Sequence, residues 1–276
     1  MPKPRTVLIT GAASGIGKAT ALLMASQGWS VAAADIDKAG AEAVAKKCGD
    51  AAFAVTLDIR SEPQWRRALD RAWKRFGRLD VLINNAAVVH TGYARDIPLA
   101  RHADTMNTNF IGPLTGMMTA LPRFKQQGYG HLVTIASMTS FIPFPGLSTY
   151  AAAKHALRAF HLALAFEERN AGLDFAIVYP GATETPMLEQ EARDDASKMA
   201  FAGNAVGPEV IAGVILEAIA KKKMEAYYPP ERGKVVRRLG VNVKALREMV
   251  ERNEAIGAEK LRARRAGTGK SHSRST

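Results

Sequence analysis

The chain has 276 residues, 47% of them hydrophobic, and a formal net charge of +12. This length and composition supply enough apolar surface for one large α/β domain, and the single cysteine, Cys48, excludes an internal disulfide. No arrangement of His, Asp or Glu has the spacing of metal ligands, so no metal site is expected.

The positive charge is concentrated near the C-terminus. Between Glu231 and Thr276, thirteen Lys or Arg and five Glu contribute +8 of the +12. The nearly neutral body argues against nucleic-acid binding. The first residues lead directly into a strand, and no run reaches the ~18 apolar residues of a membrane span. We therefore expect a cytoplasmic protein whose main domain spans residues 1–230 and is followed by a basic extension at 231–276.

Short β-rich runs alternate with segments of helical periodicity along the domain. This alternation predicts an α/β fold, in which a doubly wound, Rossmann-like parallel sheet carries helices on both faces. The ligand crevice of such a sheet lies at the carboxyl ends of its strands. Strands are expected at 5–10, 30–35, 51–57, 80–83, 131–136, 174–179 and 225–228, and helices at 62–76, 99–124 and 207–221, among others.

A glycine turn follows the first expected strand and opens a helix. Its glycines are Gly11, Gly15 and Gly17. Glycines allow backbone N–H groups to approach a pyrophosphate, which the positive end of the helix dipole also favours. The alternative is that the turn is only a connection.

Carboxylates end the next two strands. Asp35 lies 18 residues after Gly17, where an acidic side chain can accept hydrogen bonds from the adenosine ribose hydroxyls. The alternative role for Asp35 or Asp37 is to cap the following helix, and Asp37 can take that role alone. Asp58 ends the third strand, within reach of an adenine amino group.

Tyr150 and Lys154 are four residues apart in Ala-rich sequence, on one face of a predicted helix. An ammonium beside a phenol favours the phenolate, so we expect Lys154 to lower the pKa of Tyr150 toward the working pH. Ser137 ends the strand before this helix and places a hydroxyl near the same phenol. The alternative is an ordinary helix that happens to carry both residues.

Together these motifs resemble the short-chain dehydrogenase/reductase family across residues 5–230. The matching elements are Thr10-Gly11-x-x-x-Gly15-x-Gly17, Asn84-Asn85-Ala86, Asn109-x-x-Gly112, Ser137, Tyr150-x-x-x-Lys154, and Pro180-Gly181 followed by Thr185. By this resemblance the catalytic tetrad is Asn109, Ser137, Tyr150 and Lys154.

The resemblance also implies a dinucleotide site and a lid. Thr185 would bond the nicotinamide carboxamide, and residues 187–202 correspond to a mobile lid. Ala87 stands where the family usually has Gly, so a methyl group would crowd the cofactor there. The implied cofactor residues are Gly11, Ser14, Gly15, Ile16, Gly17, Asp35, Asp58, Ile59, Asn85, Ala86, Tyr150, Lys154, Pro180, Gly181 and Thr185.

The implied activity is interconversion of a secondary alcohol and a ketone, with Tyr150 as general acid/base. Because Asp35 would repel a 2′-phosphate and neither Ser14 nor Ile36 is basic, NAD is the expected cofactor. The alternatives are a reductase of a carbonyl such as a 3-oxoacyl group, and a catalytically silent NAD-sensing protein.

Apolar side chains expected around the site favour a steroid, a retinoid-like alcohol or a fatty-chain alcohol as substrate. The alternative is that the loop aromatics among them pack on one another. These side chains are Met138, Phe141, Ile142, Phe144, Met187, Leu188, Met199 and Phe201.

The extension is predicted to form an amphipathic helix followed by a disordered tail at 262–276. Such a helix can pack on its own subunit, dock on a neighbour in a homodimer or homotetramer, or rest on an anionic membrane. We rank packing first, because it needs only an apolar stripe. The stripe consists of Val243, Leu246, Met249, Val250, Ile256 and Leu261.

Overall fold

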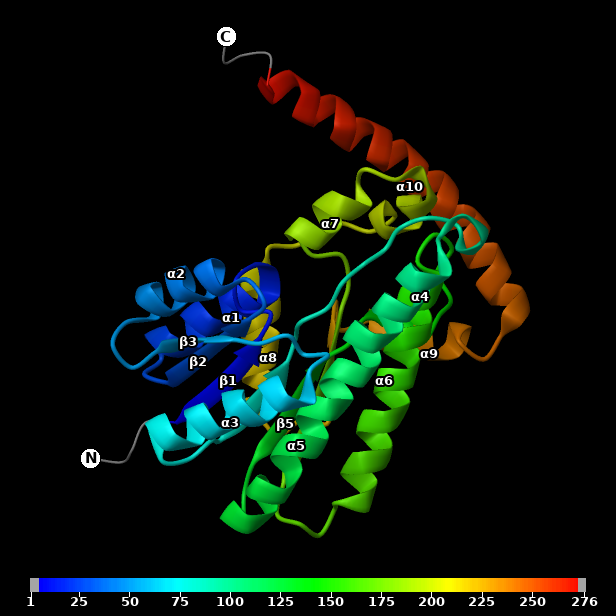
Figure 1. The fold of residues 1–276 in the computed structure, drawn as a ribbon. Coiled ribbons are helices and arrows are strands. Elements are labelled where there is room, and N and C mark those ends of the chain that lie inside the picture. The colour runs from blue at the N-terminus through cyan, green and yellow to red at the C-terminus, as the bar shows by residue number, and fades with distance from the viewer. Residues whose placement is uncertain (1–4, 273–276) are drawn as a thin grey trace.

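A computed structural model of the protein describes residues 5–272, with side chains described for residues 5–267. Seven parallel strands form one sheet in the order β3-β2-β1-β4-β5-β6-β7 (Figure 1). The predicted doubly wound fold is therefore confirmed, with each strand within two residues of its expected range. The strands are β1 (Thr6–Thr10), β2 (Ser30–Asp35), β3 (Phe53–Thr56), β4 (Val81–Asn84), β5 (His131–Ile135), β6 (Asp174–Pro180) and β7 (Glu225–Tyr228).

Helices cover both faces of the sheet because alternate residues of each buried strand point to opposite sides. On β1, Val7 and Ile9 pack with one helix layer, whereas Leu8 packs with the other. The first layer contains α1 (Gly15–Ser26), α2 (Lys38–Cys48) and α8 (Pro208–Ala220), and the second contains α3 (Glu62–Phe76), α5 (Gly112–Gln127) and α6 (Ser148–Glu167).

The helix expected at 99–124 is not regular. It is divided into α4 (Leu99–Met106), a π-helical turn η2 (Asn107–Ile111) and α5. Pro113 has no N–H to donate to the carbonyl of Asn109, and the N–H of Gly112 bonds Asn107 instead. The wider turn places Asn109 beside the segment that follows β4.

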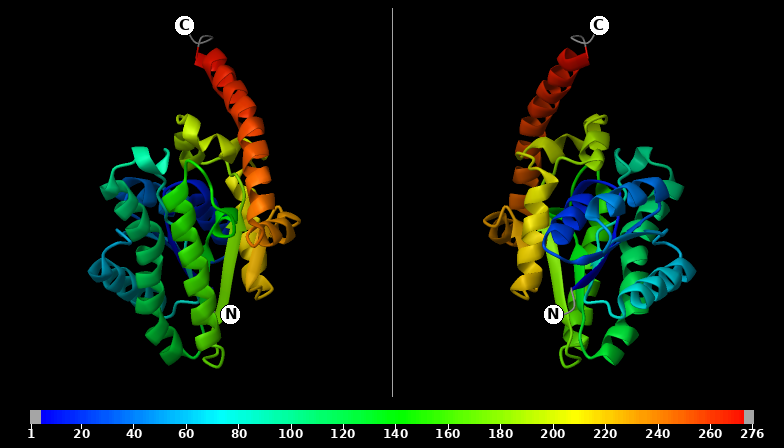
Figure 2. Two further views of the ribbon diagram at one scale, coloured as in Figure 1. Left: turned by 90° about the vertical axis from the view of Figure 1, so that its right-hand side faces the viewer. Right: turned by 90° about the vertical axis from the view of Figure 1, so that its left-hand side faces the viewer.

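The C-terminal extension packs on the chain's own body. It forms α9 (Arg232–Leu239) and α10 (Val243–His272), and α10 runs along one side of the molecule (Figure 2). Within the expected stripe, Met249 and Leu261 are buried, whereas Val243 and Ile256 are exposed. No helix within residues 5–272 combines the length and hydropathy needed to cross a bilayer.

The prediction of disorder at 262–276 is wrong for residues 262–272, which continue α10. Ion pairs explain the difference: Arg264 binds Glu184, and Arg265 binds Asp195. These two contacts hold a polar stretch in helical form on the body. The last four residues of the expected tail lie outside the described part of the chain.

Two histidines are buried, His131 at the start of β5 and His161 in α6, and they should make the stability of the fold sensitive to acid. Burial lowers the pKa of His131 to about 4 and that of His161 to about 3. Both are neutral in the folded and unfolded states above pH ~6.5, but below that value only the unfolded chain takes up these protons. Stability should therefore fall as the pH decreases from ~6.5 toward the folded-state values.

We expect His161→Gln to weaken this dependence by up to about 1.4 kcal/mol per pH unit, because one proton uptake is removed. Denaturant unfolding between pH 4 and 8 measures the slope. The control is His155→Gln, an exposed position on the same helix. Equal slopes for wild type and His161→Gln would contradict the assignment.

Candidate active site

A cavity of about 850 Å³ opens at the carboxyl ends of the strands. Residues 170 positions apart in the sequence, Gly11 after β1 and Gly181 after β6, meet in its wall. Every expected catalytic or cofactor-binding residue lines this cavity except Gly17 and Asn109. These two act from behind the wall.

The glycine turn has no room for side chains. A Cβ at Gly17 would lie 2.1 Å from the carbonyl oxygen of Gly11, and one at Gly11 would lie 2.8 Å from the Cα of Ala86. Gly11 also has a φ of +67°, which L side chains rarely adopt. Ser14 begins α1 without a side-chain cap, so the first N–H groups of the helix remain available to an anion. This arrangement fits the pyrophosphate of a dinucleotide.

Asp35 and Asp37 divide the two roles considered for them. Asp37 caps α2 by accepting a hydrogen bond from the N–H of Gly40 at 3.0 Å. Asp35 accepts from the N–H groups of Ala13 and Asp37, both at 2.9 Å, and lines the cavity. Its carboxylate is thereby fixed between the glycine turn and the end of β2.

Asp58 is engaged by an arginine. Arg60 binds Asp58 and Asp104, each at 2.8 Å, and the Arg60 hydrogen bond lowers the pKa of Asp58. Asp58 and Ile59 still line the cavity. The carboxylate expected at the adenine is therefore shared with a cation that the sequence did not indicate.

The two asparagines expected in the site hold its backbone in place. Asn85 donates to the carbonyl of Thr10 at 2.9 Å, which ties the end of β4 to the end of β1. Asn109 pairs with both backbone groups of Val88, accepting from its N–H and donating to its C=O, each at 2.8 Å. Asn109 thereby joins the π-helical turn to the cavity wall.

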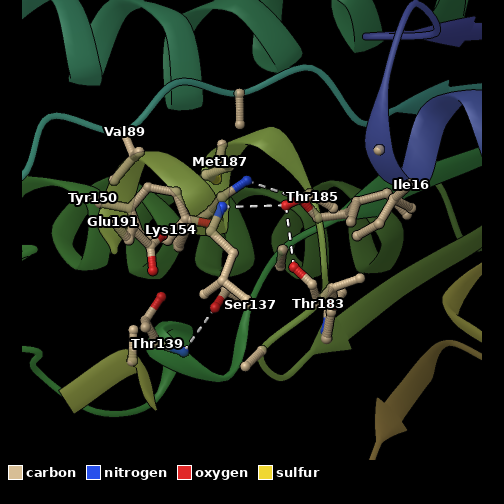
Figure 3. A pocket seen from close by; sticks show the side chains of 18 of the residues that line it. Ile16, Val89, Ser137, Thr139, Tyr150, Lys154, Thr183, Thr185, Met187 and Glu191 are labelled. Atoms are coloured by element: carbon tan, nitrogen blue, oxygen red, sulfur yellow. Dashed lines mark hydrogen bonds between the residues drawn. The ribbon is translucent and has the colours of Figure 1, made fainter. Parts of the chain in front are cut away.

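Ser137, Tyr150 and Lys154 meet at the centre of the cavity (Figure 3). The Nζ of Lys154 lies 5.6 Å from the centroid of the Tyr150 ring and donates to the carbonyl of Ile135 at 3.0 Å. Ser137 accepts from the N–H of Thr139 at 3.2 Å, which orients its hydroxyl. A phenol, a hydroxyl and an ammonium therefore converge from β5 and α6.

The prediction that Lys154 lowers the pKa of Tyr150 is wrong for this arrangement. Burial raises the pKa of Tyr150, the carboxylate of Glu191 adds to the rise, and a hydrogen bond with Ser137 opposes it. Burial also lowers the pKa of Lys154 to about 8, and its ammonium lies over the Tyr150 ring. Desolvation outweighs the attraction between the two groups.

The far wall of the cavity is apolar and comes largely from the lid. Phe141 and Phe201, expected around the site, do not line the cavity: Phe141 packs in a hydrophobic cluster with residues of β6 and α9, and Phe201 packs with Leu188 of the lid and Leu261 of α10. The other expected apolar side chains do line it, namely Met138, Ile142, Phe144, Met187, Leu188 and Met199.

The lid consists of α7 (Pro186–Glu191) and η4 (Asp195–Phe201). Thr185 caps α7 and donates to the carbonyl of Thr183 at 3.2 Å. Its methyl group lies where a side chain at position 15 would otherwise extend. Gln190 donates to the carbonyl of Val89 at 2.9 Å. Both ends of α7 are therefore attached to the body.

The extension completes the cavity wall, which sequence analysis missed. Arg232 and Val236 of α9 and Asn253 of α10 line it. Glu191 of the lid also lines it, buried at 8% exposure. In the sequence these residues lie among many similar charged and polar residues, and only the tertiary structure distinguishes them.

Backbone contacts clamp η4 between two glycines. A Cβ at Gly146 would lie 2.0 Å from the carbonyl oxygen of Ala196, and one at Gly257 would lie 2.0 Å from that of Lys198. Lys260 of α10 adds a hydrogen bond to the carbonyl of Ala202 at 3.2 Å. The lid therefore rests directly on α10.

Comparison with known proteins shows extended similarity. The family model described as short chain dehydrogenase matches residues 5–196. A 3-oxoacyl-acyl-carrier-protein reductase of Thermotoga maritima is 33% identical over 77% of this chain and 89% of its own length. A 3-alpha-(or 20-beta)-hydroxysteroid dehydrogenase of Mycobacterium bovis is 30% identical over 69% of this chain and 73% of its own length.

Solved structures agree with the sequence comparisons. The crystal structure of a short chain dehydrogenase/reductase from Burkholderia phymatum in complex with NAD superimposes with a TM-score of 0.79 at 26% identity. The alignment covers 85% of this chain and 92% of that one. The family match itself ends before the basic extension begins.

The contact at Gly257 gives a test of the wall formed by α10. We expect Gly257→Ala to destabilise the protein by about 1–3 kcal/mol, because the added methyl overpacks against η4. KM should change more than kcat, because the wall moves while Tyr150 stays in place. Thermal unfolding and steady-state kinetics measure both effects.

Gly267→Ala is the matched control, because nothing lies within 4 Å of a Cβ at that position of the same helix. Alanine there should leave stability unchanged or raise it by up to about 1 kcal/mol through helix propensity. Identical behaviour of the two variants would show that α10 does not press on the lid.

Proposed function

Because the chain belongs to the short-chain dehydrogenase/reductase family of oxidoreductases, we propose that it interconverts a secondary alcohol and a ketone on an apolar substrate, with NAD as cofactor. The observation that carries this proposal is the convergence of Tyr150, Ser137 and Lys154 beneath an apolar wall. A substrate bound there would contact the hydroxyl of Tyr150 as proton donor, the hydroxyl of Ser137 and an apolar surface.

The residues at the crevice fit a dinucleotide. The glycine turn and the uncapped start of α1 would hold the pyrophosphate, Asp35 the ribose, and Thr185 with Pro180 and Gly181 the nicotinamide end. When bound, the dinucleotide supplies the hydride acceptor or donor, and its oxidised form adds a positive charge that favours the phenolate.

Tyr150 exchanges the proton of the substrate oxygen in both directions. In oxidation its deprotonated form accepts the alcohol proton, and in reduction its hydroxyl donates a proton to the carbonyl oxygen. Ser137 holds that oxygen by a hydrogen bond in either state. The ammonium of Lys154 is held over the Tyr150 ring by its hydrogen bond to the carbonyl of Ile135. Asn109 fixes the position of the cavity wall near Val88 through its hydrogen bonds to that residue's backbone.

The same groups can reduce a carbonyl, and the Thermotoga relative is named as a reductase of 3-oxoacyl groups. Burial keeps Tyr150 protonated, which suits the proton donor of a reduction. We propose alcohol oxidation as the main direction and carbonyl reduction as the second candidate. Assembly as a homodimer or homotetramer and contact of the extension with an anionic membrane stay predictions from the sequence.

We expect Tyr150→Phe to lower kcat by at least about a hundredfold, because phenylalanine keeps the ring but cannot exchange a proton. NAD binding, measured by quenching of tryptophan fluorescence, should be unchanged. Initial rates with a panel of secondary alcohols and hydroxysteroids measure the loss. Activity retained at the wild-type level would exclude Tyr150 as the general acid/base. A wild-type protein that binds NAD but oxidises none of these alcohols would favour an NAD-sensing role.

We expect kcat/KM to be at least about a hundredfold higher with NAD than with NADP, because Asp35 would face the charged 2′-phosphate in a partly desolvated crevice. Asp35→Asn should narrow this ratio by removing the charge. The control is Asp37→Asn, which alters a cap of α2 instead. Equal efficiency of the wild type with both cofactors would show that Asp35 serves only to fix the backbone.

A further inference from the structure

The carboxyl group of Glu191 is buried in the lid and faces the catalytic pocket. Glu191 ends α7, lines the cavity and lies near Tyr150, whose pKa its charge raises (Figure 3). Among the described residues, none forms a hydrogen bond or ion pair with its carboxyl oxygens. Burial raises the pKa of Glu191 to about 7.

The charged groups of the neighbouring lid elements are used elsewhere. Lys198 of η4 faces Glu254 of α10, and Arg265 binds Asp195. On α6, Lys154 donates to Ile135. A carboxyl group without a partner in a desolvated site destabilises the protein unless a ligand satisfies it.

Thr139 provides a second unsatisfied polar group in the same wall. Its Oγ1 is buried without a hydrogen-bond partner, the residue is only 7% exposed, and it lines the cavity. Its N–H donates to the hydroxyl of Ser137, so the backbone of Thr139 lies next to that hydroxyl. Figure 3 shows Thr139, Glu191 and Tyr150 at one end of the cavity, away from Thr185 and Ile16.

A resident metal ion does not account for this pair. No group of three or more His, Cys, Asp or Glu that could hold a metal occurs in the part of the chain that the structure describes. One carboxyl and one hydroxyl suit an O–H or N–H donor instead.

We propose that Glu191 and Thr139 form a polar subsite that binds a second O–H or N–H donor of the substrate, close to its reacting carbinol. This inference rests on the proposed function and narrows the substrate class. The substrate is an apolar secondary alcohol with a neighbouring hydroxyl or amino group, and its apolar part contacts Ile142, Met187 and Met199.

Binding at this subsite also acts on the proton transfer. The negative charge of Glu191 disfavours the phenolate of Tyr150. A donor that hydrogen-bonds to Glu191 offsets part of that charge, so Tyr150 ionises more readily with the matching substrate in place. The subsite therefore links recognition to reactivity.

The test compares matched alcohols that differ only in the second group. Each secondary alcohol is paired with its neighbouring diol and its neighbouring amino alcohol, and kcat/KM is measured with NAD. We expect the wild type to prefer the donor-bearing partner by about 10- to 100-fold, the effect of a hydrogen bond to a charged group. No preference would overturn the proposal.

Glu191→Gln should abolish most of this preference. It should not slow oxidation of the simple alcohol, because it removes a charge that disfavours the phenolate of Tyr150. A larger loss with the amino alcohol identifies an ammonium ligand, because glutamine can still accept a hydrogen bond but carries no charge. Glu189→Gln is the matched control, the same change at an exposed position of the same helix. Thr139→Val gives an independent variant, expected to reduce the preference partly.

Equal losses on simple and donor-bearing alcohols would assign Glu191 a structural role and overturn the subsite. A second readout does not need turnover: calorimetric titration of the NAD-loaded protein with the diol or amino alcohol should show weaker binding by Glu191→Gln. If binding discriminates but no alcohol is oxidised, the proposed function fails and the subsite remains. If neither binding nor turnover discriminates, the subsite is excluded.

Thermal unfolding without ligand tests the unpaired state of Glu191. Its raised pKa means that the folded protein resists ionisation, so the penalty is absent below the unfolded value and complete above the folded one. Glu191→Gln should therefore unfold at a higher temperature than wild type at about pH 8.5, with no difference near pH 4. A lower melting temperature at high pH would show that the carboxylate is already satisfied.

Discussion

Burial of the ionisable side chains around the pocket is the constraint on which the site depends. Burial moves the pKa of Tyr150 up, that of Lys154 down to about 8 and that of Glu191 up to about 7. Each shift favours the neutral form. Lys154 and Glu191 thus change charge close to neutral pH, and whatever occupies the pocket alters their protonation. The net charge of this site therefore depends on the bound ligands as well as on the protein's own residues.

The lid and the extension together cover the pocket wall in which these side chains are buried. η4 is held at backbone distance by Gly146 on one side and Gly257 on the other. α10 packs alongside η4. Its ion pairs, Arg264 with Glu184 and Arg265 with Asp195, attach it to the segments on either side of α7. The lid is thus packed against α10 without intervening side chains, and the contacts of Lys260 and Arg265 add polar bonds between the two.

Local patterns predicted the sheet and indicated Tyr150 and Lys154, which the structure brings together in the cavity, because both depend on short-range features. Buried β-rich runs and the spacing from Tyr150 to Lys154 are visible in any window of the sequence. Three features were not predictable in this way. The π-helical turn arises from Pro113 in a segment with helical periodicity. Glu191 is one acid among several in its segment, and the position of α10 depends on contacts between residues far apart in the chain. Charge attraction between neighbours was also a poor guide to the pKa of Tyr150, since burial was not part of the pattern.

The cavity wall is built from residues on both sides of position 196, where the family match ends, and this affects which parts of the chain determine substrate specificity. The portion of the chain that the family model matches, residues 5–196, contains the catalytic groups and the glycine turn. Met199, Arg232 and Asn253 of the opposite wall all lie beyond it. The proposed catalytic groups thus come from the first part alone, whereas the wall opposite them is built from both parts of the polypeptide. Changes confined to the last part can therefore reshape this wall without altering Tyr150, Ser137 or Lys154, and two relatives alike over the first part can differ in the pocket that they present to a substrate.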